Sequence, residues 1–172
     1  VAMDGAIAFS CDPELPALDW LQRRDLPLVY VDMAAPPGEV AITIDDRGGA
    51  RAAAQHIVDL GHRRVALLTS GYGTEPGITT GPLTASAARH RVITERLAGW
   101  LDPLTAAGIV PLVVNQPDDL SSAPLAAARM LDLPDRPTAV LCLTDVLAQS
   151  VLAAASDAGL AVPGDLAIVG FD

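Results

Sequence analysis

The chain has 172 residues, of which 51% are hydrophobic and 19% charged, so it can form a sizeable core and is not a disordered segment. It carries 21 acidic residues against 11 basic ones, all arginine, for a net charge of −10. This excess of negative charge argues against direct binding of nucleic acid or of an anionic membrane. The apolar runs are shorter than a membrane span and no secretory signal is visible, so we expect a cytoplasmic protein.

Short apolar runs alternate with longer segments of helical period, which is typical of a parallel sheet flanked by helices. The strands are expected at residues 4–9, 27–31, 40–44, 64–69, 109–114, 138–143 and 166–170. The helices are expected at residues 15–24, 47–60, 88–107, 121–132 and 145–158. The nearly continuous apolar character of the strands predicts that they are buried on both faces.

Several boundaries carry their own signals. Asp45 and Asp46 precede an alanine-rich helix and predict N-cap acceptors, and Gly61 can end that helix in a left-handed conformation. Pro103 falls inside an expected helix and should kink or split it. The stretch 70–86 is rich in glycine and proline, which is compatible with a lid, a connection between lobes or a mobile insertion.

The sequence offers little support for catalysis, a metal or a cofactor. Gly71 and Gly73 follow a strand, but the next glycine is misplaced for a dinucleotide motif, and a Walker motif requires a lysine that is absent. The three histidines lack metal-ligand spacing, and Cys11 and Cys142 fit reduced, buried thiols. No G-x-S-x-G elbow occurs. We therefore expect neither an enzyme nor a cofactor.

Two charged residues stand out by position. Asp145 follows the expected strand 138–143, at the rim where open α/β sheets place ligands, and its carboxylate can accept hydrogen bonds from neighbouring hydroxyls. The alternative is a plain N-cap. Arg96 lies on a helix whose apolar side includes Trp100, a core candidate; it is either a solvated arginine or a planar donor facing a ligand.

Several phrases, all in one register, resemble the effector-binding core of the lac repressor (LacI/GalR) family. They span nearly the whole chain. The phrases are Pro27-Leu-Val-Tyr-Val-Asp32, Ile44-Asp-Asp-Arg-Gly-Gly-Ala-Arg51, residues 56–66, Glu95-Arg-Leu-Ala-Gly-Trp100, residues 136–140, Thr144-Asp-Val-Leu-Ala148 and residues 159–172, which end in Gly170-Phe171-Asp172.

The resemblance implies an α/β fold of the periplasmic-binding-protein-like type I, with two doubly wound parallel-sheet lobes and a small ligand between them. It places residues 1–70 in the later half of the N-terminal lobe and residues 71–172 in most of the C-terminal lobe. The near lobe is expected to be incomplete. Operator DNA would be bound only through a head domain that is not part of this chain, and a homodimer is expected.

The family pattern implies that Arg96 and Asp145 contact the effector, the two residues already singled out by their chemistry. Phe9 and Ser10 correspond to the near-lobe wall of the ligand site. Ser70 and the glycines after it are assigned to the first crossover between lobes. Leu120 falls where some members carry an aromatic ring that stacks on a sugar, and its aliphatic side chain is a departure. Thr144 in place of the usual asparagine is another.

We therefore expect the ligand-sensing region of a LacI-type transcriptional regulator that binds a sugar-like metabolite. The main alternative is a periplasmic-type sugar-binding receptor of a transporter. An enzyme of flavodoxin-like topology is a third possibility. Cofactor absorbance would reveal the enzyme, and an export signal upstream of the chain would favour the receptor.

Overall fold

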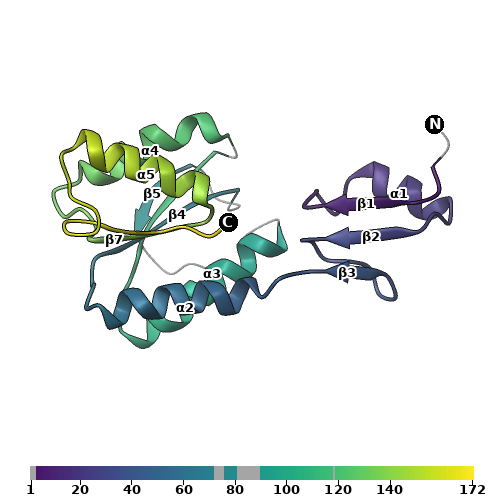
Figure 1. Ribbon diagram of the computed structural model, residues 1–172, viewed down its shortest axis with the longest axis horizontal. Helices are drawn as coiled ribbons and strands as arrows, with labels where there is room; N and C mark the ends of the chain where they lie inside the picture. The colour runs from purple at the N-terminus through teal and green to yellow at the C-terminus, as the bar shows by residue number, and fades with distance from the viewer. Residues whose placement is uncertain (1–2, 72–75, 81–89, 118) are drawn as a thin grey trace.

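A computed structural model describes residues 3–71, 76–80, 90–117 and 119–172, and it contains two sheets (Figure 1). A three-stranded parallel sheet has the order β1-β2-β3, with β1 at Ala6–Phe9, β2 at Leu28–Val31 and β3 at Val40–Ile42. A five-stranded sheet has the order β5-β6-β4-β7-β8. Its strands are β4 (Val65–Ser70), β5 (Gly77–Thr80), β6 (Leu112–Gln116), β7 (Ala139–Cys142) and β8 (Ala167–Val169).

The small sheet is covered on one face by α1 (Pro16–Arg23). Leu18 of this helix packs with Ala8, Leu28, Tyr30 and Met33 to form a compact apolar cluster. The Gln22 side-chain amide donates to the Tyr30 hydroxyl at 2.6 Å, so the polar end of this buried ring has a partner.

The larger sheet has helices on both faces, as expected for parallel strands that are buried on both sides. Helices α2 (Asp46–Asp59) and α3 (Arg91–Ala106) lie on one face, and α4 (Ala123–Leu131) and α5 (Asp145–Asp157) lie on the other (Figure 1). A short 3-10 turn, η2 (Leu120–Ser122), precedes α4. Trp100 is fully buried in the core, as predicted. Gly99 lets α3 approach α2 closely, because a Cβ at this position would collide with the Arg47 carbonyl and with the Ala50 side chain.

All the expected strands and helices are present, with boundaries shifted by a few residues. The Asp45 side chain accepts from the Gly48 amide at 2.9 Å, so it caps α2 as predicted, and Gly61 has a φ of +86°. Pro103 does not split the helix, because α3 runs continuously through this residue. The structure adds β5, an antiparallel edge strand within the glycine- and proline-rich stretch.

The division of the chain at residue 70 needs correction. Strand β4 is the central strand of the five-stranded sheet, and α2 packs on α3 of the same body, so the chain changes sheets between Ile42 and Val65. Ser70 therefore ends a strand inside one body and does not belong to a crossover between lobes.

In the part of the chain that is described, no helix is long and apolar enough to cross a membrane.

Candidate functional site

The predicted site residues lie at the carboxyl ends of the parallel strands. Phe9 ends β1 in the small sheet and Ser10 follows it, and Ser70 ends β4 in the larger sheet. Arg96 lies on α3, and Asp145 begins α5 directly after β7. Strands β1 and β2 point toward the body that holds the five-stranded sheet (Figure 1). Open α/β sheets bind their ligands at such edges.

Leu120 begins η2, four residues beyond the end of β6. This placement puts its backbone at the same end of the larger sheet as Ser70, which pairs with Gln116 at the end of β6. Ligand contact by Leu120 stays a prediction.

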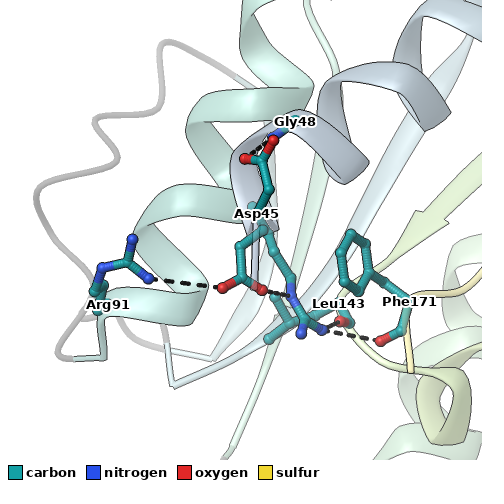
Figure 2. Close-up of polar contacts among 7 residues, drawn as sticks. Asp45, Gly48, Arg91, Leu143 and Phe171 are labelled. Carbon is teal, nitrogen blue, oxygen red and sulfur yellow. Dashed lines mark hydrogen bonds and ion pairs between the residues drawn. The ribbon is translucent and has the colours of Figure 1, made fainter. Parts of the chain in front are cut away.

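The Arg96 side chain is buried and holds several segments together. Its Nε donates to Asp46 Oδ1 at 2.9 Å, and its Nη1 donates to the carbonyl oxygens of Leu143 at 2.7 Å and of Phe171 at 2.9 Å. Figure 2 shows these two carbonyls converging on one guanidinium nitrogen. The interpretation of Arg96 as a solvated arginine is therefore wrong. Nη2 has no hydrogen-bond partner among the described residues.

Asp46 is the acidic partner of this arginine, and its side chain is fully buried. Its second oxygen, Oδ2, lies 3.8 Å from Arg91 Nη1, a distance too long for a hydrogen bond, and within the described ranges both buried atoms lack a hydrogen-bond partner. The sequence assigned Asp46 to helix capping together with Asp45. The structure separates the two roles, since Asp45 caps α2 while Asp46 turns inward to the arginines.

Phe171 completes this cluster from the segment that follows β8. The Arg96 guanidinium carbon lies 3.9 Å from the centre of the Phe171 ring, a cation–π geometry. A Cβ on Gly49 would lie 2.8 Å from Cε2 at the edge of this ring. Because glycine has no Cβ, the Phe171 ring can pack beside α2. Sequence reasoning missed Asp46, Arg91 and Phe171 as site residues, although all but Arg91 lie in phrases that carry the family resemblance.

Asp145 is exposed and occupies the first position of α5. It is not the cap of this helix, because the Thr144 hydroxyl accepts from the Leu147 amide at 3.3 Å. The Asp145 carboxylate lies against Gly170, where any Cβ would collide with it, and lines a pocket of about 290 Å³. The carboxylate therefore sits close to the positive end of the α5 dipole, which stabilises its charge.

The small sheet contributes strained backbone at its carboxyl edge. Ser10 and Asp32 follow β1 and β2 with φ values of 44° and 57°, a left-handed conformation that is uncommon outside glycine. Such conformations are concentrated at functional sites. Burial raises the pKa of Asp32, the Asp46 carboxylate raises it further, and the positive charge of Arg96 opposes the rise. The edge of the small sheet is therefore within electrostatic reach of the Arg96 cluster.

The described residues give no sign of a reactive centre. Burial raises the pKa of the Cys142 thiol to about 12, which keeps it protonated and unreactive at neutral pH. Within the described ranges, no group of three or more histidine, cysteine and acidic side chains could hold a metal ion.

The fold is that of an α/β protein of two bodies, with the predicted site residues near the carboxyl ends of its parallel strands. The family model described as periplasmic binding protein-like domain matches residues 54–172. The chain therefore belongs to the periplasmic binding protein-like domain family.

Its relatives include transcriptional regulators. An HTH-type transcriptional regulator of Mycolicibacterium smegmatis is 37% identical over 99% of this chain and 50% of its own length. A LacI-family transcriptional regulator from Corynebacterium glutamicum matches the whole chain and 53% of its own with a TM-score of 0.86 and 28% identity. The structure titled transcriptional regulator CelR–cellobiose complex matches 99% of this chain and 49% of its own with a TM-score of 0.76 and 28% identity. The chain thus spans about half the length of the relatives it matches.

We expect Asp46→Asn to destabilise the protein by about 3–5 kcal/mol, the cost of removing one partner of a buried ion pair. The asparagine keeps the size of the side chain but leaves the buried Arg96 charge without a counter-ion. Urea unfolding followed by circular dichroism measures the change. The matched control is Asp102→Asn, which breaks the exposed Arg47–Asp102 pair and should cost less than about 1 kcal/mol. Equal losses in the two variants would contradict the assigned role of Asp46.

We expect Asp32→Asn to stabilise the protein at neutral pH. Because the pKa of Asp32 is raised in the folded state, its ionised form opposes folding, and this cost is relieved as the pH falls through the raised pKa. The melting temperature of the variant should exceed that of the wild type at pH 8, with the gap narrowing toward pH 4. Asp25→Asn, at a residue with φ of 54° that precedes β2, is the control. A pH-independent gap would rule out the electrostatic cause.

Proposed function

We propose that this chain is the ligand-sensing region of a LacI-type transcriptional regulator and binds a small sugar-like metabolite between its two sheets. The observation that carries the proposal is the Arg96 cluster, which fixes one donor nitrogen at the carboxyl edge of the larger sheet. The relatives named above are transcriptional regulators, which favours this function over a transporter receptor and over an enzyme.

The proposed ligand contacts follow from the chemistry at the two sheet edges. The Asp145 carboxylate is exposed and can accept hydrogen bonds from two neighbouring hydroxyls, while the two N–H groups of Arg96 Nη2 remain available to donate. Phe9, Ser10 and Ser70 would line the site from their strand ends, with Leu120 beyond β6. The cellobiose complex of the CelR regulator supports a sugar as the ligand class.

In the intact regulator, ligand binding would shift the relative position of the lobes. We assign the three-stranded sheet to the N-terminal lobe and the five-stranded sheet to the C-terminal lobe. The shift would change the separation of DNA-binding heads that lie outside this chain and act in the cytoplasm. Its size is limited by the difference in ligand affinity between the two arrangements.

Titration of a panel of sugars and nucleosides, cellobiose included, by isothermal calorimetry tests the ligand site. For a ligand that binds the wild type, Asp145→Asn should weaken binding at least about tenfold, because a charge-assisted acceptor is lost. Asp157→Asn, at the other end of α5, should bind like the wild type.

Arg96→Ala should also abolish binding. Because this change removes the buried hydrogen bonds to Asp46, Leu143 and Phe171 as well, the folding of the variant must be verified by circular dichroism. Unchanged affinity in Asp145→Asn and in folded Arg96→Ala would remove both residues from the site.

We also propose that the uncovered face of the small sheet pairs with a second copy of the chain. Strand register places Ile7 beside Val29 and Val40 on the face opposite α1, and Ile7 is 74% exposed. Phe9 and Ile42 form the next row and are also exposed. Continuous apolar surfaces of this kind are usually buried in an interface. Strand β1 also has a free edge, which favours association.

Light scattering after size-exclusion chromatography tests this pairing. The wild type should elute as a dimer and Ile7→Lys as a monomer, because a buried lysine would lose its hydration. Leu60→Lys, at a leucine that follows α2 and is 60% exposed, should leave the dimer intact. A monodisperse monomer of the wild-type chain at micromolar concentration would contradict the proposal.

A further inference from the structure

A pocket of about 260 Å³ opens at the corner formed by β5, the end of β6 and α4. None of its lining residues belongs to the Arg96 cluster or to the predicted effector contacts. We propose that this pocket binds a small carboxylate with an apolar body, as a second ligand site independent of the sugar site. The residues that carry the argument are Ile78, Val114, Gln116, Ser122, Leu125 and Arg129.

Gln116 supplies an unpaired donor to this pocket. It is 2% exposed, and its Nε2 is buried without a hydrogen-bond partner among the residues that the structure describes. The Oε1 atom of the amide lies 3.3 Å from the Ser122 hydroxyl, whose one proton is shared with the Asp119 carbonyl oxygen at 2.8 Å. Buried amide nitrogens are nearly always paired in folded proteins, and an unpaired one calls for an acceptor from outside the chain.

The rest of the lining defines what kind of acceptor fits. Ile78, Val114 and Leu125 present apolar surface, which suits a hydrocarbon body. Arg129 is the one charged residue among the described residues that line the pocket, in a chain whose net charge is −10. This positive charge favours an anion over a neutral carbonyl compound, and a planar carboxylate matches both the guanidinium and the amide.

Benzoate is the probe, with benzyl alcohol as its uncharged counterpart, and binding is followed by ¹H–¹⁵N NMR of the complete chain. Benzoate should give saturable shifts at the Gln116 side-chain amide and at the Ile78 and Leu125 amides. Gln116→Leu, which removes the unpaired donor, should weaken benzoate binding at least about tenfold while the remaining spectrum stays that of the folded protein.

Two further variants separate charge from shape. Gln116→Glu keeps the size of the side chain but places a negative charge in the pocket, so benzoate binding should be lost. Arg129→Gln should weaken benzoate and leave the affinity for benzyl alcohol unchanged, whereas the matched change of the exposed Arg51 on α2 should affect neither ligand.

Three results would overturn the proposal. The first is the absence of saturable shifts at millimolar benzoate. The second is equal benzoate affinity in the wild type and in folded Gln116→Leu. The third is a crystal structure in benzoate in which a water molecule alone is bonded to Gln116 Nε2. Loss of sugar binding in Asp145→Asn with benzoate binding intact would show that the two sites are separate, and simultaneous loss of both would contradict their independence.

Discussion

The hydrogen bonds of one guanidinium determine how the carboxyl edge of the larger sheet is built. Arg96 on α3 reaches Asp46 at the start of α2, the carbonyl that follows β7 and the carbonyl that follows β8. A buried charge is tolerated only when it is paired and hydrogen-bonded, so these partners are obligatory. The segments that surround the proposed ligand site are thereby fixed before any ligand arrives, which lowers the entropy cost of binding.

The two bodies differ in how firmly they are built. The five-stranded sheet has helices on both faces and a large continuous core, whereas the small sheet rests on one short helix and a cluster of five buried side chains. The body with the five-stranded sheet therefore carries the Arg96 cluster. The body with the small sheet carries Ser10 and Asp32, whose backbones are in the left-handed conformation. A ligand that contacts both edges would stabilise one relative placement of the bodies, which is the physical basis for sensing.

Patterns of apolar residues predicted the order of strands and helices because buried parallel strands and amphipathic helices leave local signals. They did not reveal β5, whose Gly-Ile-Thr-Thr sequence is exposed at a sheet edge and lacks a buried face. The interpretation of the family resemblance placed the change of lobe at residue 70, because a crossover within one sheet and a crossover between sheets look alike in sequence. The burial of Arg96 depends on Asp46, which is 50 residues away, and no local pattern reports such a contact.

The protein contacts of Arg96 restrict the ligands that it favours. With Nε and Nη1 bonded to protein acceptors, the two-pronged geometry that recognises carboxylates and phosphates is no longer offered. A single Nη2 donor suits a hydroxyl, which needs one hydrogen bond and brings no charge. The Asp46 carboxylate already balances the Arg96 charge, and Asp32 and Asp145 add negative charge near the same edges, which disfavours anions further. If the proposed site binds a ligand, this arrangement therefore favours an uncharged polyol over a phosphorylated sugar, although an arginine lies at its centre.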